Sequence, residues 1–171
     1  MHALAGLLIF CQALGAVGGA ASAVWGEIEY ARAIRDGNID AAERAHLKSI
    51  ARGLRYGMSL LLVSSIGLVI LAFEVASPVA PALTASYWAF ISLSLLIVAV
   101  TWALSRKRLS FAVGSASAFT AWWFLAYLTL GQFPQLSFGA SVALYVVSTA
   151  VLYALLRYAR ILIIARAKKS A

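Results

Sequence analysis

Five long apolar stretches, separated by short polar connections, constrain this chain more than any other feature of its sequence. Each is close to the roughly 20 apolar residues that an α-helix needs to cross a membrane. They run over residues 4–30, 53–73, 85–104, 109–130 and 138–156. None shows the strict alternation of a barrel strand. With 63% hydrophobic and 12% charged residues, the 171-residue chain has no segment left for a soluble domain. The sequence therefore predicts an all-α, polytopic membrane helical bundle that forms one domain, residues 1–171.

The basic residues predict on which side of the membrane each connection lies. All 14 Lys and Arg fall within residues 32–55, 106–108 and 157–169, and the other connections have none. Cytoplasmic loops carry an excess of Lys and Arg, so five spans with the N-terminus outside place every basic segment in the cytoplasm. We therefore predict a multi-pass protein of a bacterial inner membrane with its C-terminus inside and a cytoplasmic helical extension over residues 31–52.

A cleaved signal peptide is the competing interpretation of the first stretch, because Ala21-Ser22-Ala23 resembles a cleavage site. The stretch lacks a basic segment before it. Cleavage would also leave four spans, whose parity puts all 14 basic residues on the outer side. The sequence thus favours a retained first helix.

A polar turn over residues 36–40 predicts that the first two helices form a hairpin. Gly37 can close a helix, and Asp40 has capping-box spacing with Glu43. One basic stripe follows at intervals of four, four and three residues: Arg44, Lys48, Arg52 and Arg55. The stripe is expected to set topology, with attraction of anionic lipid or an acidic partner as the alternative. Nucleic acid is not an expected partner, because the charges flank membrane spans.

Small residues form a ridge on the first helix. Gly15 and Gly19 make a GxxxG pattern, Gly18 lies between them, and Ser22 with Gly26 extends the ridge. Such residues let helix backbones approach closely in lipid. We expect this ridge to pack within the chain against the second or fifth helix. A seam between two copies, making a homo-oligomer, is the alternative.

Polar groups inside the apolar stretches are scarce, and a charge there costs several kcal/mol. Glu27, at the inner end of the first helix, is expected to pair with a cation between Lys48 and Arg52. Its functional alternative is a site for a cation or substrate at the cytoplasmic mouth. Gln12, near the middle of the same helix, is expected to hydrogen-bond to another helix, with a binding role as the alternative.

A resemblance rests on four features of about the first 73 residues. They are His2 at the start of an apolar helix, Gly15-x-x-Gly18-Gly19, Arg35-Asp36-Gly37-x-Ile39 and Ser64-Ser65-x-Gly67. Together they resemble the leading hairpin of small uncharacterised bacterial inner-membrane proteins, which are distantly similar to the copper-resistance D-type membrane family. The resemblance implies a helical bundle whose first-helix histidine, here His2, contributes to a haem or copper site. Leu54, Tyr56 and Met58 stand where a second histidine would be expected.

No HExxH, GxSxG, CxxC or P-loop pattern occurs, so the sequence predicts no catalytic residues. We expect a non-enzymatic scaffold, assembly or accessory component with no cofactor or metal, which acts through helix packing and its basic inner face. Its expected partner is the lipid bilayer, with anionic lipid or another membrane protein as alternatives. One alternative is a small-solute transporter or channel subunit; the other is a haem- or copper-binding redox protein that uses His2. A polar path for a solute would be lined by hydroxyl groups: Ser64, Ser65, Ser92, Ser94, Thr101, Ser115, Ser117, Thr120, Ser148 and Thr149.

Overall fold

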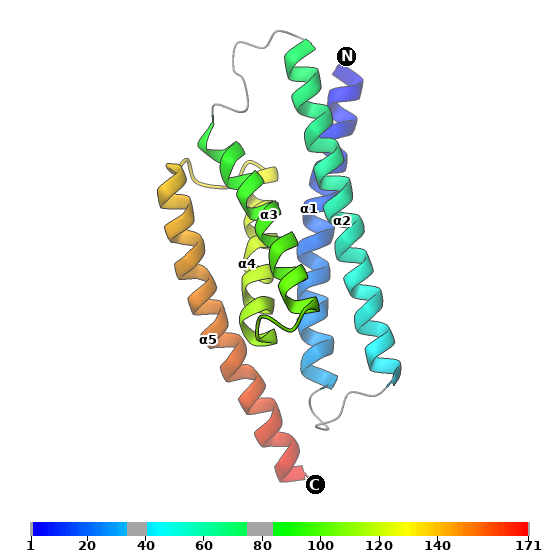
Figure 1. The fold of residues 1–171 in the computed structure, drawn as a ribbon, viewed down its shortest axis with the longest axis vertical. Helices are drawn as coiled ribbons and strands as arrows, with labels where there is room; N and C mark the ends of the chain where they lie inside the picture. The colour runs from blue at the N-terminus through cyan, green and yellow to red at the C-terminus, as the bar shows by residue number, and fades with distance from the viewer. Residues whose placement is uncertain (1, 34–40, 75–83, 171) are drawn as a thin grey trace.

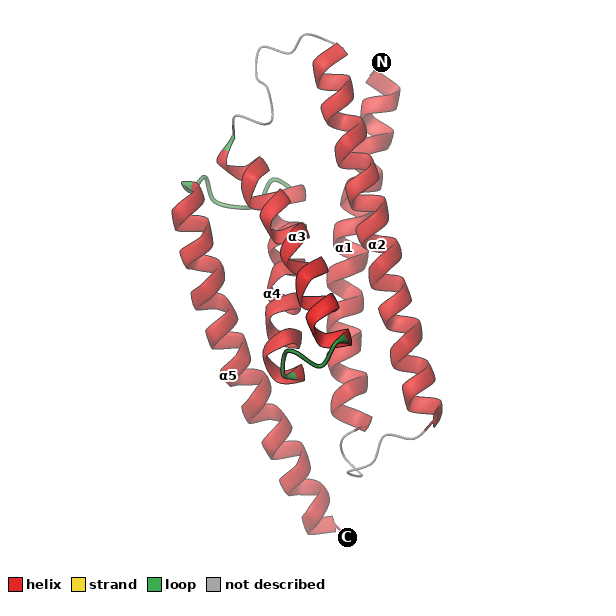
Figure 2. Cartoon of the chain, viewed as in Figure 1, coloured by secondary structure: helices red, strands yellow, loops and turns green. Residues whose placement is uncertain are grey.

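The part of the chain that the computed structural model describes contains five helices, each long and apolar enough to cross a membrane. They are α1 (His2–Ala33), α2 (Ala41–Glu74), α3 (Ala85–Ser105), α4 (Phe111–Thr129) and α5 (Phe138–Ser170). The structure describes residues 2–33, 41–74 and 84–170; for residues 2, 42–44 and 166–170 it describes the backbone alone. The described residues contain no strand (Figure 2). The predicted all-helical bundle is confirmed at this level. The turn over residues 36–40 and the capping box of Asp40 with Glu43 lie outside the described atoms.

The helices alternate in direction along the bundle. In Figure 1, α1 and α2 lie side by side, α3 and α4 occupy the middle, and α5 lies on the other flank. The start of α1 and the end of α5 lie at opposite ends, as an odd number of crossings requires. Because α2 and α4 begin where α1 and α3 end, the segments that carry the basic residues, namely the first part of α2, the α3–α4 turn and the last part of α5, all lie in the lower half of this view.

Two tight connections have local explanations. Leu130 ends α4, and Gly131 follows with φ of +69°, a conformation that glycine adopts without strain. The Gln132 amide then donates to the Tyr127 carbonyl at 2.9 Å. The α3–α4 turn has the same hydrogen-bond pattern, but Lys107 occupies the left-handed position with φ of 54°. The start of α3 is capped by Thr84, whose hydroxyl accepts a hydrogen bond from the Tyr87 amide.

The glycine ridge of α1 lies against α2. A Cβ added to Gly15 would stand 2.8 Å from the Gly57 carbonyl oxygen, and one added to Gly57 would stand 3.1 Å from the Gly15 carbonyl oxygen. Lower down, Gly26 is near Ile50 and Gly53 is near Ser22. The two backbones therefore approach at positions where side chains are absent on both helices.

The second neighbour of the ridge is α4. The ring of Trp122 occupies the space that a side chain on Gly19 would need. Trp122 is 1% exposed and is the largest fully buried side chain among those described. Of the two neighbours expected for the ridge, the second or the fifth helix, the structure has the second, and α5 packs mainly against α4. Gly18 is exposed and has no atom within 4 Å of an added Cβ.

The core follows from this arrangement. Ala16 and Ala20 of α1 lie beside Leu61 of α2, and Phe90 of α3 and Leu125 of α4 complete the centre. Small residues on α1 meet large residues on its neighbours, which lets the layers interdigitate. Most large apolar side chains of α5, including Val147 and Leu155, and several of α2, including Val63 and Ile70, face outward. In a chain with five apolar spans, that surface suits contact with lipid.

Candidate functional site

Two charged side chains from distant parts of the chain meet near the lower end of the bundle. Arg160 of α5 donates from Nη2 to Oε2 of Glu27 on α1 at 2.6 Å. The same nitrogen donates to the Ser115 hydroxyl of α4 at 2.9 Å. The side chains of Arg160 and Glu27 are only 12% and 13% exposed. This buried ion pair connects α5 to both α1 and α4.

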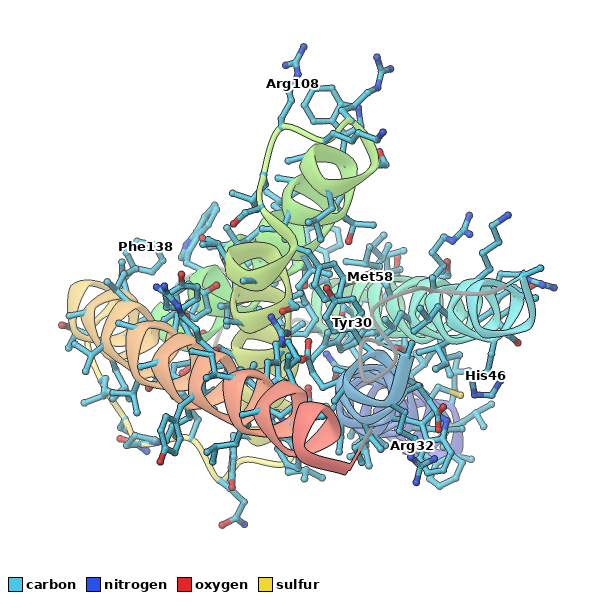
Figure 3. All side chains as sticks on the ribbon, turned by 90° about the horizontal axis from the view of Figure 1, so that it is seen from below. Tyr30, Arg32, His46, Met58, Arg108 and Phe138 are labelled. Carbon is cyan, nitrogen blue, oxygen red and sulfur yellow. The ribbon has the colours of Figure 1, made fainter. Side chains whose placement is uncertain are left out.

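Aromatic rings form the walls around the guanidinium. The centroids of Tyr30 on α1 and Phe111 on α4 are 4.0 Å apart. The Arg160 Cζ atom lies 5.1 Å from the Tyr30 centroid and 5.5 Å from the Phe111 centroid. A planar, weakly hydrated guanidinium suits such surroundings better than an ammonium group, because it can stack on aromatic faces. Tyr30 lies near the middle of the bundle when seen from below (Figure 3).

One donor of the guanidinium is buried and unpaired among the described residues. Arg160 Nε is buried and has no hydrogen-bond partner in the described part of the chain. A buried donor without a partner costs about 1–3 kcal/mol. The Glu27 carboxylate, the Ser115 hydroxyl and the two rings must together compensate for this cost and for the desolvation of both charges. The arrangement supplies strong attraction between three helices.

The predicted partner of Glu27 is wrong, and helix geometry gives the reason. Successive residues of an α-helix point about 100° apart. Gly26 faces Ile50 of α2, so Glu27 is turned away from α2 and towards α4 and α5. Lys48 and Arg52 are exposed. One feature of the sequence pointed to Arg160 as the true partner. Four apolar residues, 161–164, follow it, so the apolar part of the fifth helix continues beyond the predicted end of the span at residue 156.

Gln12, near the middle of α1, was expected to hydrogen-bond to another helix, and it does so. Its Nε2 donates to the Ser65 hydroxyl of α2 at 2.8 Å. Ser65 in turn donates to the Leu61 carbonyl at 2.7 Å. The Ser65 hydroxyl has one proton, which it donates to Leu61, so it can only accept a hydrogen bond from Gln12. The NH2 group of the Gln12 amide must therefore face Ser65.

A cavity of about 290 Å³ adjoins Gln12 and Ser65. The walls are apolar in large part and come from α1, α2, α3 and α4. Polar atoms enter from Thr84, Ser86 and Thr129, and none of the described residues that line it is charged. No hydrogen bond joins the Gln12 Oε1 atom to a described residue, so the amide has acceptor capacity left.

The other candidate hydroxyls do not share one cavity. Several donate to a carbonyl of their own helix, as Ser64, Ser94, Thr101 and Thr120 do. Ser117 pairs with the Tyr145 hydroxyl of α5 at 2.6 Å. Ser92 lines an apolar cavity of about 260 Å³ between α3 and α5, whereas Ser148 lines a separate groove between α4 and α5. Thr149 Oγ1 is buried without a partner among the described residues.

The remaining predicted residues are dispersed. Lys48, Arg52 and Arg55 are exposed along α2, and the side chain of Arg44 is outside the described atoms. His2 begins α1, and its side chain is likewise not described. Among the side chains that are described, no group of three or more His, Cys, Asp or Glu is placed to hold a metal ion.

Sequence reasoning missed four residues of the ion-pair site and one helix contact. Arg160, Ser115, Tyr30 and Phe111 were not expected to meet, since they come from three helices. Gly57 was also missed as the partner of Gly15, although Gly53 and Gly57 form a second GxxxG pattern on α2. Comparisons of this chain with protein-family models, curated proteins and solved structures found no match.

Proposed function

We propose that the protein is a non-enzymatic scaffold, assembly or accessory component of a bacterial inner membrane. One observation carries the proposal: the polar side chains within the described helices mostly join helices or their own backbone. Glu27, Arg160 and Ser115 join α1, α5 and α4, and Gln12 with Ser65 joins α1 and α2. Groups used in this way favour a stable bundle whose outer faces contact lipid and other membrane proteins.

The proposed orientation places the N-terminus outside and the C-terminus in the cytoplasm. The support for this orientation is that the three basic segments, in α2, the α3–α4 turn and α5, all lie towards the same end of the bundle (Figure 1). The positive-inside rule assigns that end to the cytoplasm. Fusion of alkaline phosphatase or green fluorescent protein after residue 171 tests it. A fluorescent, phosphatase-negative C-terminus is expected, and the opposite pattern would reverse the assignment.

Site-specific photo-crosslinking tests the scaffold role in the membranes of the native host. Benzoylphenylalanine is placed at Val63 of α2 or at Val147 or Leu155 of α5, which are 67%, 61% and 58% exposed. The half-buried Tyr145 is the matched control, because it faces the interior of the chain. We expect a discrete higher-mass adduct from one exposed face and none from Tyr145. Adducts to lipid alone at every position would refute a protein-binding role.

A second candidate function is the passage of a small neutral solute, and the cavity beside Gln12 favours it. The lining combines hydroxyl and amide groups with apolar walls and carries no charge, which suits a solute of the size and polarity of glycerol or urea. Stopped-flow light scattering on proteoliposomes measures entry of these two solutes. Transport requires faster equilibration than in protein-free vesicles and its loss in Gln12→Leu, with the exposed Gln132→Leu as control. Equal rates in all vesicles would remove this candidate.

A further inference from the structure

The short turn between α3 and α4 carries three consecutive cations, Arg106, Lys107 and Arg108, all of them exposed. No ion pair involves them in the part of the chain that the structure describes. Two other basic residues, Arg32 and Arg160, do have carboxylate partners. The turn is therefore a compact positive charge with no acidic partner among the described residues.

Both arginines lie against one aromatic ring. The Cζ atoms of Arg106 and Arg108 are 5.6 Å and 5.1 Å from the centroid of Trp102. The backbone fixes this arrangement, because Lys107 is in the left-handed conformation and the Arg108 amide donates to the Ala103 carbonyl at 2.9 Å. Two guanidinium groups held on one indole are ordered before any ligand arrives, so less conformational entropy is lost on binding.

An apolar stripe leads along α3 to this pair. Leu95, Val98 and Trp102 are 64%, 52% and 49% exposed and follow one another at helical spacing. Arg108 points away from the other helices in the view from below (Figure 3). A ligand for this surface has an anionic head within reach of the guanidiniums and an apolar tail that can lie along the stripe.

We infer that the α3–α4 turn is a binding site for the phosphate of an anionic phospholipid, with Arg106 and Arg108 as its ligands and Trp102 as their support. Guanidinium groups bind phosphate oxygens through paired N–H donors, and tryptophan suits the membrane interface. The basic stripe of α2 lacks this construction, since Arg52 and Arg55 are exposed without an aromatic support among the described contacts. The site is independent of the scaffold and transport proposals.

Native mass spectrometry of the detergent-purified chain tests the inference. The probes are phosphatidylglycerol, phosphatidylcholine and glycerol 1-phosphate, which separate an anionic lipid from a zwitterionic lipid and from a soluble phosphate. We expect one molecule of phosphatidylglycerol to bind in preference to the other two. In R106Q/R108Q its Kd should rise by about thirtyfold, because each basic residue at a membrane surface contributes about a fivefold factor.

Two further variants distinguish a built site from general charge attraction. R52Q/R55Q removes the same number of charges from α2 and should change the Kd less than threefold. Trp102→Leu keeps every charge and should still weaken binding several-fold, because the arginines lose their common support. Equal weakening in R52Q/R55Q and R106Q/R108Q would overturn the inference. Binding of glycerol 1-phosphate as tight as that of phosphatidylglycerol would also overturn it, since the ligand would then be a soluble anion.

Discussion

Replacing Glu27 by leucine should loosen the attachment of α5 at the lower end of the bundle. It would leave the Arg160 charge, 12% exposed, with the Ser115 hydroxyl and two aromatic faces only. Removing one partner of a buried ion pair costs about 3–5 kcal/mol. The contacts that Arg160 retains, each cation–π contact being worth about 0.5–2 kcal/mol, place the expected loss near the lower end, about 3 kcal/mol.

A double-mutant cycle separates the ion pair from its surroundings. Arg160→Leu alone should cost a similar amount, because Glu27 would then be the buried charge without a cation. E27L/R160L should unfold within about 1 kcal/mol of the native protein, since a buried ion pair replaced by apolar side chains is often neutral. Unfolding by sodium dodecyl sulfate in mixed micelles, followed by tryptophan fluorescence and circular dichroism, measures all four free energies.

The neighbouring ion pair on α1 supplies the matched control. Glu29 accepts a hydrogen bond from Arg32 at 2.8 Å, but the Arg32 side chain is 66% exposed. Glu29→Leu should therefore cost no more than about 0.5 kcal/mol. A cysteine replacing the buried Ser115, in a Cys11→Ser background, reports locally: maleimide labelling should be slow in the parent and fast with Glu27→Leu. Additive losses in the double variant, or unchanged labelling, would show that the pair does not hold α5 in place.

Three other changes have defined outcomes. Gly19→Leu should destabilise the bundle by about 1–3 kcal/mol or prevent folding, because the Trp122 ring fills that space, whereas Gly18→Leu should change unfolding by less than about 0.5 kcal/mol in the same micelle assay. Gln12→Leu should cost about 0.6–2 kcal/mol through the lost bond to α2, and a variant as stable as the parent would contradict a stabilising role for this hydrogen bond. The purified protein should be colourless and free of stoichiometric copper; a haem or copper signal that disappears with His2→Ala would establish the redox alternative instead.

Much of the bundle could be predicted because hydropathy is a local property. A run of about 20 apolar residues must form its backbone hydrogen bonds internally in lipid, so it becomes a helix wherever its partners lie. The five spans were therefore readable from the chain, and so was the clustering of basic residues at alternate connections. The small residues of α1 likewise indicated a close helix contact, though not which helices would make it.

Partners of individual side chains depended on the rotation of each helix about its axis, which no local pattern specifies. Glu27 met Arg160, 133 residues away, because Gly15, Gly26 and Gly57 let α2 pack on one side of α1 and left the carboxylate facing another. The Ser and Thr hydroxyl groups could not be told apart from the sequence. In the structure some bond to their own backbone, some bond to another helix and some line separate cavities. The sequence by itself determined five apolar helices and the end of the bundle that carries the charge. Only the tertiary structure decided which polar groups meet, since side-chain packing between helices far apart in the chain sets those distances.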